Sequence, residues 1–252
     1  MSGTESTDRP GEAAAVLFDV DGTLMDTVHL HTVCWWEALR QGGHAVAMTR
    51  VHRCVGMGSD HLLDALLGED RDHGGDEGLS AAHDALYAQY WSRLAPLDGA
   101  ADLVRACVDR GWRVVLASSA KSGEAEVMTD ALGVADVLFA TTTADDVDAS
   151  KPAPDLVRQA LDKAGVAADR AVFVGDAVWD AQSAGKAGVR CLGVLSGGAF
   201  SRAELVDAGA ERVYDGPADL LSALDDSPLA AVPAPVPAPA GRRSADTKEE
   251  HR

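Results

Sequence analysis

Short apolar runs alternate with helix-like stretches over most of the chain, and this alternation constrains the fold more than any other feature. The runs are rich in valine and leucine, and they comprise residues 13–20, 112–119, 136–142, 170–176, 189–195 and, more weakly, 211–215. Continuous apolar runs of this length are typical of strands that are buried on both faces. The helix-like stretches between them are residues 99–111, 122–133, 153–165 and 179–188. Strand alternating with helix predicts an α/β fold with a doubly wound (Rossmann-like), mostly parallel sheet.

One interval breaks this rhythm. Residues 26–95 contain no strong strand and carry amphipathic helical stretches at 29–43, 60–68 and 80–94. We expect a second, helical domain inserted after the first strand and joined near residues 24–26 and 94–97. The predicted division of the chain is a disordered leader (1–12), an α/β core (13–25 and 96–226), a helical domain (26–95) and a disordered tail (227–252). The tail holds five of the ten prolines and then turns charged, a composition that resists helix and sheet.

Charge and cysteine usage limit the class of protein. The formal net charge of −18 argues against a nucleic acid or an anionic membrane as partner, since both need a basic surface. The four cysteines are scattered without a C-x-x-C pair, which favours free thiols in a reducing cytosol over a zinc or redox site. The polar, acidic start cannot serve as a signal-peptide core, and no apolar run approaches the ~20 residues of a membrane span. We expect a cytoplasmic protein.

Polar side chains close the predicted strands, where ligands bind in open α/β sheets. The first strand ends in Asp19 and Asp21, the second in Ser118 and Ser119, and the fourth in Asp176, with Asp180 one helical turn beyond and Lys151 in the segment "SKPAPD". Segments distant in the sequence thus deliver carboxylates, hydroxyls and one ammonium group to one edge of the sheet. Closely packed ionised carboxylates repel one another, so a fold keeps them only for a purpose.

This set has a chemical logic. Alternate strand residues share a face, so Asp19 and Asp21 can point towards one pocket. Asp19 could attack phosphorus as a nucleophile, and Asp21 could act as general acid and base. A divalent cation, most plausibly Mg²⁺, would relieve the crowding among Asp19, Asp176 and the backbone around Asp21. Lys151 and the Ser118 hydroxyl would hold the phosphoryl oxygens.

The motifs "DVDGTLMDT", "VVLASS", "SKPAPD" and "VFVGDAVWD", in this order, resemble the haloacid dehalogenase superfamily of phosphotransferases. The branch containing phosphoglycolate phosphatases and β-phosphoglucomutases is the most similar. The resemblance implies Asp19 as nucleophile, Asp21 as acid/base, and Ser118 and Lys151 as phosphoryl ligands, with Asp176 as a metal ligand. Asp180 matches a second acidic position whose role varies, and it is a further candidate metal ligand. The resemblance also implies that the helical insertion is a mobile cap.

Several residues admit a second interpretation. Ser119 could share the task of Ser118 in binding phosphate. Asp26 could cap the first helix of the insertion or belong to its hinge. Asp180 could sit in the first turn of a helix, where the dipole favours it. His29 and His31 form a weak metal-like pair, and substrate-side packing is the alternative for His31.

The insertion also holds candidate specificity positions. The glycines of "GMGSD" follow no good strand, so a dinucleotide site is improbable there. In the related family this segment lies near a loop that reaches the substrate, which makes Arg53, Met57 and Ser59 candidate specificity positions.

Three functions compete. The leading hypothesis is an Mg²⁺-dependent phosphatase that hydrolyses a small phosphorylated metabolite, of the phosphoglycolate or sugar-phosphate type, through an aspartyl-phosphate. A phosphosugar mutase of the β-phosphoglucomutase type would need an inward cation in the insertion, a role that Arg53 could fill. A non-enzymatic phosphoacceptor module would use similar residues, but such modules lack a long helical insertion.

Overall fold

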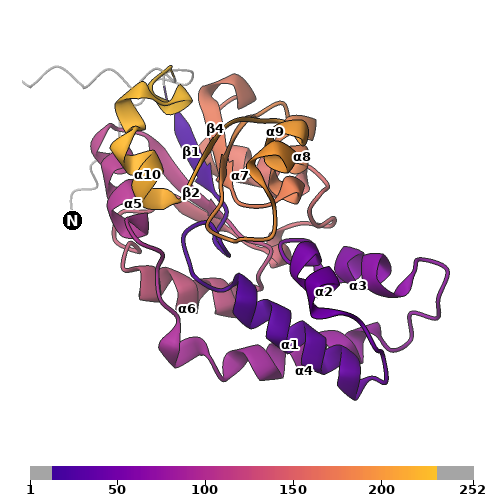
Figure 1. Ribbon diagram of the computed structural model, residues 1–252. Helices are drawn as coiled ribbons and strands as arrows, with labels where there is room; N and C mark the ends of the chain where they lie inside the picture. The colour runs from indigo at the N-terminus through magenta and orange to yellow at the C-terminus, as the bar shows by residue number, and fades with distance from the viewer. Residues whose placement is uncertain (1–12, 232–252) are drawn as a thin grey trace, which may run out of the picture.

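A six-stranded parallel sheet forms the centre of the molecule (Figure 1). The computed structural model describes residues 13–231. The strands are β1 (Ala15–Phe18), β2 (Arg113–Ala117), β3 (Ala140–Thr142), β4 (Ala171–Gly175), β5 (Arg190–Val194) and β6 (Ala210–Tyr214). Their order is β3-β2-β1-β4-β5-β6, and every neighbouring pair is parallel. The predicted doubly wound α/β fold is confirmed, although β3 is shorter than the apolar run that predicts it.

Helices cover both faces of this sheet. They are α5 (Ala100–Asp109), α6 (Ser122–Leu132), α7 (Asp155–Ala164), α8 (Val178–Lys186), α9 (Arg202–Asp207) and α10 (Pro217–Ser222). Alternate residues of β1 face opposite sides, so Val16 packs in the cluster of α5, α6 and α10, and Leu17 in that of α7 and α8. Because both faces are buried, the strands read as continuous apolar runs rather than alternating ones.

The helical insertion gathers beneath the sheet in Figure 1. It comprises α1 (Val28–Gln41), α2 (Met48–Cys54), α3 (Ser59–Leu67) and α4 (Asp76–Ala88). It has its own apolar cluster, which includes Trp35, Leu39 and Leu63. The insertion therefore has an apolar core of its own, and the division of the chain into two domains remains a prediction.

The two connections to the insertion run side by side. The Asp26 amide donates to the Ala95 carbonyl at 3.0 Å, and the Leu97 amide donates to the Leu24 carbonyl at 2.8 Å. Thr27, not Asp26, is the N-cap residue of α1, and the Asp26 side chain is exposed. The backbone of Asp26 therefore belongs to the junction, which favours its interpretation as a hinge residue.

The short 3₁₀ helices complete the described chain. They are η1 (Trp91–Arg93), η2 (Ala144–Asp146), η3 (Ala168–Arg170), η4 (Leu224–Asp226) and η5 (Pro228–Ala231). Leu229 in η5 is fully buried against the core, so the folded chain extends past the predicted limit at residue 226. The apolar side chain of Leu229 packs against the core and holds this last 3₁₀ turn in place. The predicted leader and residues 232–252 of the predicted tail lie outside the described residues.

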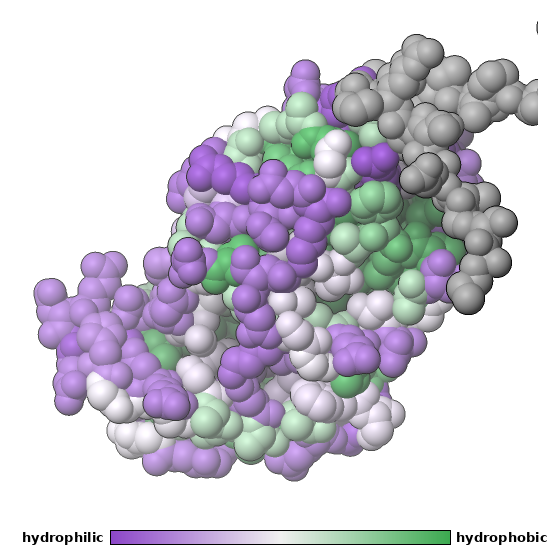
Figure 2. Space-filling model, turned by 180° about the vertical axis from the view of Figure 1, so that it is seen from behind, coloured by the Kyte–Doolittle hydropathy of each residue, from purple (hydrophilic) through white to green (hydrophobic). Residues whose placement is uncertain are grey.

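Hydrophilic residues cover much of the face seen in Figure 2. Within residues 13–231, none of the helices has the length and apolar character needed to cross a membrane.

Candidate active site

Two neighbouring strands bring the first pair of predicted site residues together. β1 and β4 lie where the strand order reverses, and Asp19 and Asp176 directly follow them. The Asp19 amide donates to the Val174 carbonyl at 2.9 Å, which fixes the first loop against the second strand. Gly22 has φ +80°, and a Cβ there would lie 2.6 Å from Asp176 Oδ2. Glycine at this position therefore permits both the turn and the close approach.

Asp19, Asp176 and Asp180 form a buried group of carboxylates, here called the core cluster. One oxygen from each lies within 4.8 Å of the others, and the three residues are 4%, 6% and 2% exposed. Lys151, which is fully buried, places Nζ 2.5 Å from Asp19 Oδ1 and 2.8 Å from Asp180 Oδ1. The Thr23 hydroxyl donates to Asp19 at 3.2 Å and to Asp176 at 3.3 Å. Residues from three distant segments thus meet at one point.

The core cluster holds more negative charge than its lysine can balance. Burial raises the pKa of Asp19 to about 7, even though the Lys151 ammonium lowers it. Burial raises the pKa of Asp176 well above its usual range, and the charges of Asp19 and Asp180 raise it further. A divalent cation with hard oxygen ligands would compensate this crowding. The residues present therefore fit a metal such as Mg²⁺.

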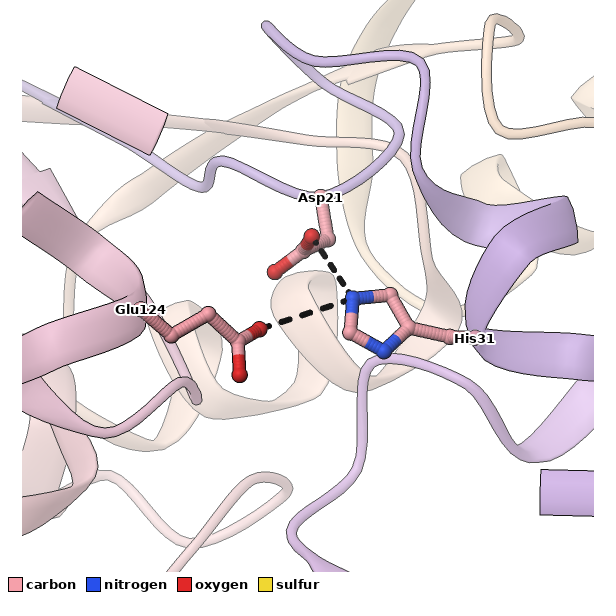
Figure 3. Close-up of side chains that lie close together, drawn as sticks. All are labelled: Asp21, His31 and Glu124. Atoms are coloured by element: carbon pink, nitrogen blue, oxygen red, sulfur yellow. Dashed lines mark hydrogen bonds and ion pairs between the residues drawn. The ribbon is translucent and has the colours of Figure 1, made fainter. Parts of the chain in front are cut away.

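The Asp21 carboxylate belongs to a second group, here called the bridging cluster. It accepts a hydrogen bond from the Thr27 hydroxyl at 2.6 Å, and its Oδ1 lies 3.1 Å from His31 Nε2. Glu124 Oε1 lies 3.6 Å from the same nitrogen, so His31 sits between two carboxylates (Figure 3). Asp21 follows β1, His31 comes from α1 and Glu124 from α6. For the predicted metal, the backbone of Asp21 remains a candidate ligand.

The bridging cluster continues from His31 into helix α4. His31 Nδ1 lies 3.1 Å from His83 Nε2, and His83 Nδ1 lies 3.0 Å from Asp84 Oδ1. Burial lowers the pKa of His83 to about 4, so this ring is neutral near pH 7. A neutral His83 that donates from Nδ1 to Asp84 leaves Nε2 free to accept from His31. A protonated His31 can then donate to His83 and Asp21 together.

The pKa shifts of the partners agree with that arrangement. Burial of the His31 ring lowers its pKa, but the charge of Asp21 and their hydrogen bond outweigh this and raise the pKa overall. Burial likewise raises the pKa of Asp21, and the charge and hydrogen bond of His31 outweigh it, so that the net shift is downward. Burial raises the pKa of Glu124 to about 7. The bridging cluster therefore favours an ionised Asp21 beside an imidazolium.

The two predicted phosphate-binding serines lie in different surroundings. Ser118 is fully buried, and its Oγ accepts the backbone N–H of Ala120 at 3.0 Å. Ser119 lines the pocket between the core and the insertion, where its hydroxyl donates to the Gly56 carbonyl at 3.3 Å. Phosphate binding by both residues remains a prediction, with Ser119 the one that lines the pocket.

The pocket has a volume of about 270 Å³ and reaches both clusters. Met57 and Ser59, two of the predicted specificity positions, line it. Arg53, the third, does not: its guanidinium lies 2.6 Å from Glu204 Oε1 and over the Phe200 ring, where it lines a separate pocket. The expectation that Arg53 supplies an inward cation is therefore wrong, because an acidic partner on α9 holds it outside the pocket.

Sequence reasoning missed His83, Asp84 and Glu124. A usable signal existed for His83. His83 lies four residues after Leu79 and four before Tyr87, on the buried face of α4. A polar side chain on such a face requires a hydrogen-bond partner. Nothing comparable marks Asp84 or Glu124, because exposed helices carry many acidic residues and only packing shows which of them face a site.

Comparison with known proteins adds an independent finding. A model of the family described as haloacid dehalogenase-like hydrolase matches residues 13–188. The chain is 31% identical over 210 residues to phosphoglycolate phosphatase of Rhodospirillum rubrum, covering 80% of this chain and 86% of that protein. It is 30% identical over 219 residues to the chloroplastic protein SUPPRESSOR OF QUENCHING 1 of Arabidopsis thaliana, covering 84% of this chain but 20% of that much longer protein.

Among solved structures, the crystal structure of a hydrolase from Pseudomonas syringae is similar with a TM-score of 0.80 and 34% identity. The match covers 84% of this chain and 98% of that one. It therefore includes the insertion as well as the sheet.

Proposed function

Because this chain belongs to the haloacid dehalogenase-like hydrolases, we propose that it is a Mg²⁺-dependent phosphatase of a small phosphorylated metabolite. The observation that carries the proposal is the pair of carboxylates two residues apart with different partners. Asp19 lies against Lys151 in the core cluster, and Asp21 lies against His31 in the bridging cluster. Two carboxyl groups in contrasting environments are suited to different steps of one reaction.

In the first step, Asp19 attacks the phosphorus atom and the ester oxygen leaves. The bond from phosphorus to that oxygen breaks as the bond to the Asp19 carboxylate forms, giving an aspartyl-phosphate. The His31 imidazolium, 3.1 Å from Asp21 Oδ1, supplies a proton to this carboxylate, and Asp21 donates it to the leaving oxygen. The ammonium of Lys151, 2.5 Å from Asp19 Oδ1, is placed to stabilise negative charge on the phosphoryl oxygens.

In the second step, water attacks the aspartyl-phosphate and restores the free carboxylate of Asp19. Asp21 is now ionised and takes a proton from the water. The Thr27 hydroxyl and His31 hold Asp21 in place for this transfer. When bound, the cation would be held by Asp19, Asp176 and Asp180, and it would neutralise charge on the phosphoryl group.

The position of Arg53 favours hydrolysis over the mutase hypothesis. A mutase must hold the second phosphate of a bisphosphate while the intermediate turns over. The residue that could supply this cation from α2 is paired with Glu204 outside the pocket. We therefore place hydrolysis first.

The unpaired state of the four cysteines supports a reducing compartment, and we propose the cytoplasm.

Phosphate release from a panel of phosphorylated metabolites and p-nitrophenyl phosphate, measured with and without Mg²⁺, tests the function. The Asp19→Asn variant should lose at least roughly a thousandfold of the Mg²⁺-dependent kcat/KM, as expected when a nucleophile is removed. Asp130→Asn removes an exposed carboxylate on α6 and should retain wild-type activity. Near wild-type hydrolysis by Asp19→Asn would exclude the covalent mechanism. Trapping of ³²P-labelled phosphate on Asp21→Asn, but not on a variant that carries both Asp19→Asn and Asp21→Asn, would support the covalent mechanism.

A further inference from the structure

The pocket carries more acidic than basic side chains beyond the reacting carboxylates. The acidic residues that line it there are Asp60, Asp84, Glu124 and Asp148. Among the described residues of its lining, the lysines are Lys121 and Lys151, and arginine is absent. The side chains around a leaving group are therefore mainly negatively charged, and they repel anions.

Both lysines are already engaged by carboxylates. Lys151 is buried between Asp19 and Asp180 at the reaction centre. Lys121 Nζ lies 2.6 Å from Asp84 Oδ2, and this ion pair joins α4 of the insertion to the start of α6. The protonated His31 also lines the pocket, and it lies between Asp21 and Glu124. None of these three cations is available to a distant anionic group of a substrate without breaking an existing pair.

The acidic groups stand on several walls of the pocket. Asp60 lies in the first turn of α3, where its Oδ1 accepts the Ser150 hydroxyl at 2.7 Å. Glu124 lies on α6, facing His31. Asp148 lies in the exposed loop that precedes Lys151. A group that enters between them is surrounded by negative charge rather than placed beside a single acid.

Hydroxyl groups supply the other polar lining. Ser59, Ser80, Ser119 and Ser150 all line the pocket, and a serine hydroxyl can both donate and accept a hydrogen bond. The volume of about 270 Å³ admits a leaving group with several such partners. The lining thus matches hydroxyl and amino groups better than carboxylates.

We propose that this pocket takes a phosphomonoester whose leaving group bears hydroxyl or amino groups and no second anionic group. The inference rests on the proposed phosphatase function and narrows its substrate class. A carboxylate or second phosphate would meet repulsion with no free cation, whereas an ammonium group would gain attraction. For two charges about 6 Å apart at an effective dielectric constant of about 40, each such interaction changes kcat/KM by roughly tenfold.

Two matched series of phosphomonoesters test the proposal. The short series is phosphoethanolamine, ethylene glycol monophosphate and 2-phosphoglycolate, and the long series is glucosamine 6-phosphate, glucose 6-phosphate and 6-phosphogluconate. Within each series the size is similar and the leaving group is cationic, neutral or anionic. In the series that is hydrolysed faster, the amine should exceed the acid in kcat/KM by at least roughly tenfold, with the neutral ester between them. An acid that equals or exceeds its amine there would overturn the proposal.

Charge variants provide a second readout within the same enzyme. Asp84→Asn removes the partner of Lys121. The kcat/KM of the acidic ester divided by that of the neutral ester, here called the acid-to-neutral ratio, should therefore rise by roughly tenfold. Because the ratio is taken within one variant, a general loss of activity through His83 cancels. Asp60→Asn should move the ratio in the same direction. Glu126→Gln removes an exposed carboxylate from α6 outside the pocket and should leave the ratio unchanged. Ratios unchanged in Asp84→Asn and Asp60→Asn would contradict the proposal.

The failure of this inference can be told from failure of the proposed function. If p-nitrophenyl phosphate and all six esters are inert with Mg²⁺, the phosphatase function fails and the inference fails with it. If p-nitrophenyl phosphate is hydrolysed while the acids are preferred, the phosphatase function stands and the substrate class is wrong.

Discussion

Asp19 and Asp21 are separated by one residue, yet they belong to clusters that are built in opposite ways. The core cluster draws Asp19 and Asp176 from loops at the end of the sheet and Asp180 from the first turn of α8, and all of them belong to the α/β core. The bridging cluster holds Asp21 with His31 and Glu124, so that the insertion and the core each contribute a side chain.

This difference separates the proposed chemistry into two parts. The core cluster needs no residue of the insertion, so its geometry depends on the α/β core alone. The bridging cluster requires α1 and α4 to lie against α6, because His31 and His83 come from the insertion. A nucleophile on the sheet and an acid/base group tied to the insertion would allow the position of the insertion to control the proton transfers without disturbing the metal site.

The largest effect should come from removing one carboxylate of the core cluster. Asp176→Asn should lower kcat/KM by more than about 100-fold, since loss of an outer-shell partner of a metal alone typically costs roughly 10–100-fold. It should also raise the Mg²⁺ concentration needed for half-maximal activity. In EDTA the same variant should be more stable, with a free energy of unfolding higher by about 1 kcal/mol, because a repulsive buried charge is gone.

Thermal unfolding in EDTA and a Mg²⁺ titration of activity measure these two effects. A rise of about 1 kcal/mol corresponds to a Tm increase of roughly 2–4 °C in a chain of this size. A lower Tm for Asp176→Asn in EDTA would show that the carboxylates are not crowded.

A smaller effect on activity should follow from a change in the bridging cluster. His31→Gln removes the charge that lowers the pKa of Asp21, so that pKa rises and the acidic limb of the kcat profile moves to higher pH. We expect kcat to fall by roughly 10- to 100-fold, the range of a general acid–base contribution. The half-maximal Mg²⁺ concentration should stay within about twofold, because His31 lies outside the core cluster.

His29→Gln is the matched control, since His29 is an exposed histidine on the same helix. A change of the Mg²⁺ requirement in His31→Gln as large as that in Asp176→Asn would show that the two clusters act as one.

The same contrast explains what the sequence could predict. The residues of the core cluster follow strands β1 and β4, and strand ends of a parallel sheet converge by topology, so Asp19 and Asp176 could be brought together from the pattern alone. Glu124 and His83 lie on helices, and which helical face meets the site depends on how the insertion packs against the core. That packing is set by side-chain shapes across two segments, which no local pattern encodes.

The stability of the bridging cluster should depend on pH through His83. Its pKa is about 4 in the folded chain and 6.5 when unperturbed, so between these values the unfolded state binds a proton that the folded state does not. The free energy of unfolding should therefore fall as the pH drops from 6.5 towards 4, by up to about 1.4 kcal/mol per pH unit from this group. His83→Gln should lose less stability over this range than the wild type.

Urea unfolding at pH 7 and pH 5 measures this difference. Glu124, with a pKa of about 7 when folded, acts in the opposite direction over the same range, so the comparison must be made between the variant and the wild type. His61→Gln, at an exposed position on α3, should show the wild-type dependence. Equal losses in His83→Gln and the wild type would mean that His83 takes up its proton equally in the folded and unfolded states.

The smallest effect should come from a contact between insertion and core that lies outside the pocket. Arg53 and Glu204 are 51% and 42% exposed, and solvent screening leaves an exposed ion pair with little effect on stability. Arg53→Ala should therefore leave the urea midpoint of unfolding close to that of the wild type and change kcat/KM by less than about twofold. Urea unfolding and steady-state hydrolysis of mono- and bisphosphates check this. If Arg53→Ala selectively weakened the binding of bisphosphates, the side chain would have to enter the pocket during turnover. That result would favour the mutase hypothesis again and would make Arg53 a part of the substrate-binding site.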